Sequence, residues 1–176
     1  HTIYNQNELL LDQSLHASAL VSSHTLISAI PQLYQLAQGK SSTVLHVSAE
    51  NTTVNSFADF SSVMAIRSSG LTLLSSSTVQ EAHDLAIIAH MVAIKTHSPV
   101  LHFFDSKRIA DEYATIQVVE PSVLSQLITA QDIETHQQYQ PSQPTTAYLQ
   151  YKQPSENTID IYAAVQEAMV QFATIT

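Results

Sequence analysis

The sequence of 176 residues contains no cysteine and only two glycines. Without cysteine the chain cannot form disulfides, thiolate zinc sites, cysteine-ligated iron–sulfur clusters or a cysteine nucleophile. Gly39 and Gly70 stand far apart, so they cannot build a loop in which the backbone presses close to a phosphate. This excludes both a dinucleotide-binding fingerprint and a Walker loop.

Basic residues are also scarce, with 6 Lys and Arg against 15 Asp and Glu and a formal charge of −9. A nucleic-acid surface needs a stripe of Lys and Arg that releases counterions, so we expect no nucleic-acid partner. The apolar runs are far shorter than the roughly 20 residues of a membrane span, and no basic segment marks a signal peptide. We therefore expect a cytoplasmic protein without a membrane partner.

A hydrophobic fraction of 44% and a charged fraction of 12% are typical of a folded domain. The length suits one domain with a sizeable core, which we place over residues 1–176. Because the chain begins with His1 rather than Met, we expect it to be a fragment of a larger multidomain protein.

Short β-branched runs alternate with helical stretches along the chain, which predicts an α/β fold with a mainly parallel sheet covered on both faces. The runs expected to form strands are 43–47, 63–66, 71–74 and 100–104. The segments expected to be helical are 23–38, 77–96, 122–130 and 159–172, and 137–144 is expected to be a loop.

Two of these helices carry further signals. Pro31 lies inside the first, so either that helix is kinked or a helix begins at the proline. Ser77 or Thr78 can cap the long helix, Glu81 supplies the acid of a capping box, and Pro99 lies just beyond its end. The apolar residues cover most of the circumference of this helix, which predicts burial on most sides.

Three histidines of the long helix follow a spacing of seven residues: His83, His90 and His97. Residues seven apart lie about 10.5 Å apart along a helix, whereas zinc holds nitrogens at about 2.1 Å, so we expect a packed polar edge and no metal site. A serine hydrolase would need a strained turn around its nucleophile, and the Ser75–Ser77 run has no flanking glycine. That run is better explained as a strand end leading into a helix cap.

Carboxylates offer two further candidates. Glu81 and Asp84 could share a site, although the helix dipole alone explains acids near a helix N-terminus. Asp105 follows a predicted buried strand, at the carboxyl end where α/β folds place ligand-contacting residues, and Lys107 and Arg108 follow it. The alternative role for Asp105, capping the next helix, is favoured.

Several blocks in the same order resemble the N-terminal, pyrimidine-binding-type thiamine diphosphate domain of pyruvate:ferredoxin oxidoreductases. The resemblance covers about residues 20–173 and rests on His46–Ala49, Val63–Arg67 with Gly70, Ser75–Ala86, Leu101–Asp105 and Ile159–Val165. The stretch from the serine run to Leu85 is its most specific part. It implies a three-layer α/β/α thiamine-diphosphate-type fold.

The chain departs from this family pattern at positions that serve the cofactor and the substrate. In the family, an arginine that binds the pyruvate carboxylate follows the His-Val-Ser-Ala block, where this chain has Glu50, and an Asp-Gly turn is Asp105-Ser106 here. From the resemblance we also expect the preceding part of the domain, with the glutamate that protonates the cofactor's aminopyrimidine ring, to be absent from this chain. The resemblance therefore implies no catalytic or cofactor-binding residue in this chain.

A retained scaffold with a lost site is similar to the degenerate domains at the front of fungal assimilatory NADPH sulfite reductase subunits. This implies a noncatalytic role in subunit association or scaffolding, within an oxidoreductase of sulfur assimilation and of cysteine and methionine biosynthesis. The parent would carry sirohaem, an iron–sulfur cluster and FMN, or FAD and NADPH, in other modules. Expected partners are those modules or subunits, or a second copy of this chain.

Two alternatives stay open. The chain could be the catalytic part of a 2-oxo acid:ferredoxin oxidoreductase whose missing residues come from a partner chain. It could also be a small-molecule binding module that uses a cleft at the strand ends, with Glu50, Arg67 and Asp105 as candidate residues.

Overall fold

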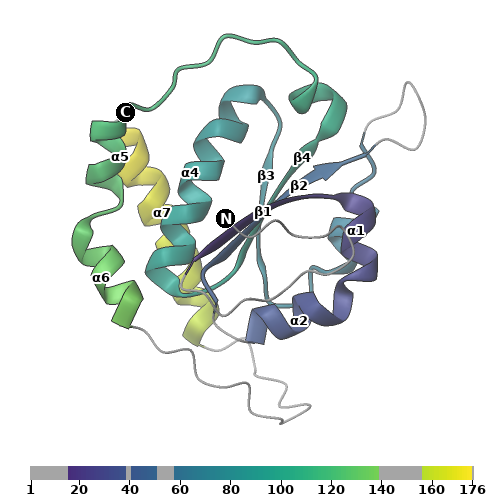
Figure 1. Cartoon of the computed structure of the whole chain (residues 1–176), viewed down its shortest axis with the longest axis horizontal. Helices are drawn as coiled ribbons and strands as arrows, with labels where there is room; N and C mark the ends of the chain where they lie inside the picture. Colours follow the sequence, from purple (N-terminus) through teal and green to yellow (C-terminus); the bar gives the residue numbers. More distant parts are fainter. Residues whose placement is uncertain (1–15, 39–40, 51–57, 139–155, 176) are drawn as a thin grey trace.

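The computed structural model describes residues 16–38, 41–50, 58–138 and 156–175 (Figure 1). The elements in chain order are β1 Ala17–Ser22, α1 Ser23–Ser28, α2 Ile30–Gln38, β2 Thr43–Ala49, α3 Ser61–Ala65, β3 Thr72–Ser76, α4 Val79–Thr96, β4 Val100–Asp105, the π-helical turn η1 Ser106–Ala110, α5 Pro121–Leu127, α6 Ala130–Gln138 and α7 Glu156–Ile175. No helix in these ranges is long and apolar enough to cross a membrane.

The described strands form one parallel sheet in the order β1-β2-β4-β3. Strand β2 pairs with β1 on one side, Val21 opposite Val47, and with β4 on the other, where Ala49 lies opposite Asp105. Because all four strands are parallel, their carboxyl ends lie at the same edge of the sheet. We call this the carboxyl edge, and it is where folds of this class place ligand-contacting residues.

Helices lie on both sides of the sheet (Figure 1). Side chains alternate between its two faces, and each face has its own core. On one face α1, α2 and α3 cover the side chains of Leu45, Val47, Leu101 and Phe103. On the other face α4, α5 and α7 pack together with Val44, Leu74 and Val100. The predicted three-layer α/β/α architecture is therefore confirmed.

Helix α4 is held by the capping residues that the sequence indicated. The Thr78 hydroxyl accepts a hydrogen bond from the amide of Glu81, at 3.1 Å, and the Glu81 carboxylate accepts one from the amide of Ser77, at 2.8 Å. His97 ends the helix with a φ of 50°, a left-handed conformation that is uncommon for residues other than glycine. The capping-box prediction is confirmed.

The structure corrects one predicted strand. Residues 63–66 belong to the short helix α3 and the residues that follow it, because Val63 and Ile66 are spaced three apart and both point into the core, whereas Met64 is exposed. Four residues are too few to distinguish the two-residue period of a strand from the 3.6-residue period of a helix. Here the core contacts favour the helix.

Other segments differ from expectation as well. The predicted helix over 23–38 is two helices that meet at Ala29, with Pro31 in the first turn of the second, which decides between the two possibilities for the proline. Strand β1 was not predicted, and helix α6 includes Gln137 and Gln138, which were expected to begin a loop. The remaining residues of that predicted loop, and Gly39, lie outside the described residues.

Candidate functional site

The carboxyl edge brings Glu50 and Asp105 together. Asp105 is the last residue of β4 and lies opposite Ala49, the last residue of β2, so Glu50 extends from the neighbouring strand end. The segment that follows β2 returns to the same place: the amide of Ala58 donates to Asp105 Oδ2 at 3.0 Å, and the amide of Asp59 donates to the Glu50 carbonyl at 3.1 Å. The two strand ends and this returning segment therefore form one hydrogen-bonded cluster.

Asp105 is a structural cap. It is 7% exposed, and its Oδ1 accepts hydrogen bonds from the amides of Lys107, at 2.9 Å, and Arg108, at 3.1 Å. With the bond from Ala58 to Oδ2, both carboxylate oxygens hold backbone donors. The capping role expected from the sequence is confirmed, and this carboxylate fixes the turn that follows β4.

Glu50 is held by the start of α1. Its backbone amide donates to the Ser23 hydroxyl at 3.2 Å, and its carboxylate lies 3.2 Å from the imidazole of His24. Both side chains of that ion pair are partly or largely exposed, at 47% for Glu50 and 76% for His24, so solvent screens the pair. Glu50 is the more accessible carboxylate of the two strand ends.

Arg67 lies apart from these carboxylates. It follows α3 in the connection that leads to the amino end of β3, and its guanidinium donates to the carbonyl of Met64 at 2.8 Å. Gly70, in the same connection, has a φ of +95° and faces Ala37 at the end of α2. The structure therefore joins Glu50 and Asp105 at the carboxyl edge but places Arg67 toward the amino edge.

The segments that leave and enter the carboxyl edge are rich in carboxylates. Their basic residues are Lys107 and Arg108. Their acidic residues are Glu50, Asp59, Glu81, Asp84, Asp105, Asp111 and Glu112. Glu81 and Asp84 do not share a site, because Glu81 bonds Ser77 and Asp84 accepts from the side chain of Gln80 and lies beside His83. The Ser77 hydroxyl and amide hold the pKa of Glu81 below its usual value.

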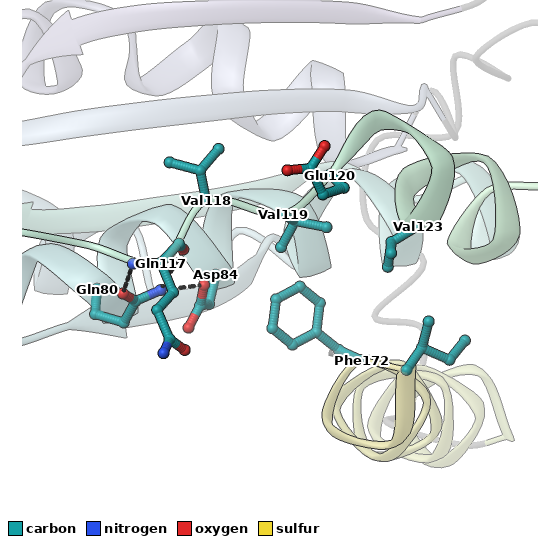
Figure 2. Close-up of a pocket in the computed structure, with 9 residues that line it drawn as sticks. Gln80, Asp84, Gln117, Val118, Val119, Glu120, Val123 and Phe172 are labelled. Carbon is teal, nitrogen blue, oxygen red and sulfur yellow. Dashed lines mark hydrogen bonds between the residues drawn. The ribbon is translucent and has the colours of Figure 1, made fainter.

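A pocket of about 230 Å³ lies beside the N-terminal part of α4 (Figure 2). The side-chain amide of Gln80 reaches across to the extended segment before α5, donating to the carbonyl of Gln117 at 3.0 Å and accepting from its amide at 2.7 Å. Val119, Val123 and Phe172 form an apolar part of the wall, whereas the carboxylates present are Asp84 and Glu120. Negative groups without a cationic partner in the wall suit a neutral or cationic group better than an anion.

A serine and a histidine also meet in the interior, Ser76 Oγ lying 2.9 Å from His102 Nε2. Both side chains are buried, with 4% and 1% exposed, and the second ring nitrogen of His102 faces His46 rather than a carboxylate. A nucleophile must reach its substrate and its base needs an orienting acceptor, so this pair lacks the features of a hydrolase site. The serine run ends β3 and leads into the cap of α4, as predicted.

The three histidines at heptad spacing on α4 point to separate partners. His83 lies 2.8 Å from Asp84, His90 lies 2.9 Å from His16, and His97 lies 3.0 Å from His136. Within the part of the chain that the structure describes, no group of three or more His, Asp or Glu is arranged to hold a metal ion.

The sequence reasoning missed the contacts of His16, His46 and His136. A signal was present for one of them, because His46 and His102 occupy equivalent places in two runs predicted to be strands, and parallel neighbours would bring them side by side. No comparable signal exists for His16, whose partner on α4 is 74 residues away.

Comparison with known proteins agrees with this fold. The family described as pyruvate flavodoxin/ferredoxin oxidoreductase, thiamine diphosphate-binding, matches residues 16–176. The chain is 37% identical over 122 residues to the pyruvate:ferredoxin oxidoreductase of Moorella thermoacetica, covering 65% of this chain and 10% of that protein. It is 30% identical over 163 residues to the mitochondrial pyruvate dehydrogenase [NADP(+)] of Euglena gracilis, covering 90% of this chain and 9% of that protein.

A third relative is the pyruvate-flavodoxin oxidoreductase of Nostoc sp. (strain ATCC 29151 / PCC 7119), 30% identical over 173 residues, which covers 90% of this chain and 43% of that protein. The chain thus spans about a tenth of the first two relatives and under half of the third. The family match over residues 16–176 includes every described strand and helix. The chain therefore belongs to the thiamine diphosphate-binding domain family of the pyruvate flavodoxin/ferredoxin oxidoreductases.

Proposed function

We propose that this chain is one domain of a multidomain oxidoreductase that oxidises a 2-oxo acid, with pyruvate as the expected substrate and a ferredoxin or flavodoxin as electron acceptor. The observation that carries this proposal is the family match over residues 16–176, together with relatives whose names specify pyruvate. Because the chain corresponds to about a tenth of the larger relatives, the activity would belong to the whole protein.

The described residues do not by themselves fit a thiamine diphosphate site. At the carboxyl edge the oxygens of Asp105 are committed to backbone amides, and Glu50 is paired with His24. The remaining side chains of this edge are mostly acidic, which opposes the binding of a diphosphate. The groups that bind and activate the cofactor would therefore come from outside the described residues, and in this proposal another part of the parent protein or a partner chain supplies them.

The contribution of this chain would then be to shape one wall of the site. Asp105 joins two segments that border the edge, the returning segment at Ala58 and the turn η1. Glu50 would stand beside the substrate region as a negative charge. A carboxylate at this place weakens the binding of a 2-oxo acid rather than strengthening it.

A second candidate function follows from that charge. A domain that keeps its core but opposes anions at its carboxyl edge suits a scaffolding role in another cytoplasmic oxidoreductase, for which NADPH-dependent sulfite reductase is our candidate. In that case sirohaem, the iron–sulfur cluster and the flavins would reside in other modules. The relatives' names favour the 2-oxo acid proposal over this one.

The test uses the intact protein that contains this chain. Pyruvate-dependent reduction of flavodoxin or ferredoxin supports the first proposal, whereas sulfite-dependent oxidation of NADPH without any response to pyruvate would refute it in favour of the second. Calorimetric titration of the chain with thiamine diphosphate and magnesium adds a separate readout, since micromolar binding would contradict the supply of these groups by another part of the parent protein or a partner chain.

The Glu50→Gln variant tests whether Glu50 borders the substrate. If this edge borders a 2-oxo acid, removing the charge lowers KM for pyruvate several-fold and leaves kcat unchanged, because only the repulsion of the substrate carboxylate changes. Glu134→Gln on α6 is a matched control at an exposed acid, and its KM should stay at the wild-type value. An equal KM for both variants would show that Glu50 does not border the substrate.

A further inference from the structure

The pocket beside the N-terminal part of α4 shares no lining residue with the strand ends at Glu50 and Asp105 (Figure 2). Its volume of about 230 Å³ corresponds to about seven or eight water molecules of the liquid. Pockets for drug-sized ligands are larger, at roughly 300–1,000 Å³. The pocket therefore suits a small molecule or a single side chain.

The wall of the pocket combines α4, the segment between η1 and α5, the start of α5 and the end of α7. The segment between η1 and α5 arches over the amino end of α4 (Figure 1). The side chain of Gln80 holds it there, because Oε1 accepts from the amide of Gln117 at 2.7 Å and Nε2 donates to its carbonyl at 3.0 Å. This clamp keeps two sides of the pocket in a fixed relation.

Asp84 is the partly buried carboxylate of the pocket, with a side chain that is 28% exposed. Its Oδ1 accepts a hydrogen bond from Gln80 Nε2 at 2.9 Å and lies 2.8 Å from His83 Nδ1. Its Oδ2 has no hydrogen-bond partner among the described residues. Because an ionised carboxylate accepts about four hydrogen bonds, Asp84 can still bind a donor that enters the pocket.

The charges around the pocket favour a cationic donor. Glu120 is the second carboxylate of the wall, and Figure 2 shows it turned away from the ring of Phe172. Among the described residues that line the pocket, none is Lys or Arg. His83 beside Asp84 carries a positive charge only when its ring is protonated. The pocket therefore attracts cations and repels anions.

The rest of the wall is apolar. Figure 2 shows Val119 and Val123 on one side of the space and Phe172, which is 8% exposed, on the other. An aliphatic chain that lies against these side chains loses contact with water. Each methylene that is fully buried in this way tightens binding by up to about fourfold.

A metal ion does not suit this wall. Calcium and magnesium take six or more oxygen ligands, whereas the carboxylates that line the pocket are Asp84 and Glu120. Within the described ranges, no group of three or more His, Asp or Glu is arranged to hold a metal ion. An ammonium group carries one charge and three N–H donors, so one carboxylate and solvent suffice to bind it.

We propose that this pocket binds an ammonium group carried on a short aliphatic chain, with the charge at Asp84 and the chain against Val119, Val123 and Phe172. A free alkylamine has this chemistry, and so does the lysine side chain of a partner protein, which ends in four carbons and an ammonium group. The inference does not depend on the proposed function, because it uses neither the carboxyl edge nor a 2-oxo acid.

The experiment is an NMR titration of the 176-residue chain at pH 8 and low ionic strength with n-butylammonium, 1-butanol and butyrate. Alkylammonium ions, like lysine, stay protonated at this pH. We expect a dissociation constant on the order of 1 mM for butylammonium, with shifts of the amides of Gln80, Gln117, Val119 and Val123. 1-Butanol should bind at least about threefold more weakly, and butyrate should not shift these amides. Equal affinity for butylammonium and 1-butanol, or shifts confined to other amides, would overturn the proposal.

The Asp84→Asn variant removes the charge and keeps the shape of the side chain. It should weaken butylammonium binding about threefold to fivefold and leave the affinity for 1-butanol unchanged. Glu112→Gln is the matched control, at an exposed acid of the segment after η1 that does not line the pocket. An equal loss in both variants would refute a specific role for Asp84. If Asp84→Asn does not fold, the three probes on the wild-type chain still decide.

Two further probes test the apolar wall and the source of the ammonium group. Val123→Ala should weaken butylammonium about twofold to threefold and leave methylammonium unchanged, because only the longer chain reaches that side chain. An equal loss for both ions would contradict the proposed orientation. Lysine blocked at both backbone ends identifies the source. If it binds as tightly as butylammonium, the pocket takes a partner's lysine, whereas binding at least about tenfold weaker assigns the pocket to a free amine.

Discussion

Replacing Asp105 by alanine tests how much of the carboxyl edge depends on one carboxylate. The side chain is 7% exposed and accepts three backbone hydrogen bonds, from Ala58, Lys107 and Arg108. The Asp105→Ala variant leaves these donors without their acceptor. The returning segment and the turn after β4 then lose the group that joins them, so the stability should fall.

The magnitude follows from the number and kind of bonds removed. A hydrogen bond to a charged group contributes about 1.5–3 kcal/mol, and loss of an N-terminal cap alone costs about 1 kcal/mol. Relief of the buried carboxylate's desolvation offsets part of this sum, and water can reach the partly exposed amides. We therefore expect Asp105→Ala to lower the free energy of unfolding by about 3–4 kcal/mol.

Urea unfolding followed by circular dichroism measures this change. With a slope of about 2 kcal/mol per molar urea, the midpoint should fall by about 1.5–2 M. Asp105→Asn keeps one oxygen acceptor and should lose roughly half as much. Asp111→Ala, an exposed acid just after the same turn, is the control and should change stability by less than about 0.5 kcal/mol. A loss below about 1 kcal/mol for Asp105→Ala would refute the capping argument.

Two further changes test the caps and the core. Thr78→Ala removes the acceptor for the Glu81 amide at the start of α4 and should lower the free energy of unfolding by about 1 kcal/mol, measured by thermal or urea unfolding. The control Ser122→Ala removes an exposed hydroxyl in the first turn of α5 and should cost much less. Equal losses for the two variants would contradict the cap. Leu33 is 0% exposed in the core under α2, and Leu33→Ala leaves a cavity that should lower the free energy of unfolding by about 3–5 kcal/mol. The control Ile27→Ala, at a side chain that is 57% exposed, should change it little. A loss below about 1.5 kcal/mol for Leu33→Ala would show that the surrounding core collapses to fill the cavity.

The sequence predicts those elements whose local pattern and tertiary environment agree. Strand β2 is a β-branched run, strand β4 is a run of apolar and aromatic residues, and both are largely buried on both faces. Helix α4 has a cap, an acid in its first turn and a stop, so every local signal points to the same structure. Residues 63–66 were predicted wrongly because four apolar residues have no decisive period, and only the core contacts of Val63 and Ile66 select a helix.

Strand β1 lacks a local signal for a different reason. Its sequence, Ala17–Ser22, mixes small and polar residues, and one side chain, Leu20, is 72% exposed, so neither burial nor β-propensity marks it. Its extended conformation is instead accounted for by pairing with β2 along six residues. Such pairing depends on residues more than twenty positions away, which a local reading does not include.

The residues of the candidate site also divide into those whose positions the sequence predicts and those whose positions it does not. Glu50 and Asp105 could be placed together because parallel strands end at one edge whatever their order in the sheet. Arg67 could not be placed without knowing that the run before it is helical, since its position along the sheet depends on how far α3 carries the chain back. The contacts among the histidines could not be predicted in the same way, because they combine strand register, the rotation of α4 and the docking of α6.

The bonds of Asp105 also bear on where an anion could bind. Backbone amides that converge at the carboxyl edge of a parallel sheet are the groups that such folds offer to phosphates and carboxylates. Here three of them, from Ala58, Lys107 and Arg108, converge on a carboxylate that belongs to the chain itself. An anionic ligand would have to displace Asp105 from donors at 2.9–3.1 Å to use them. For this reason we expect that in any catalytic parent the cofactor's phosphates bind groups outside the described residues, and that the amides of this edge hold its own loops in place.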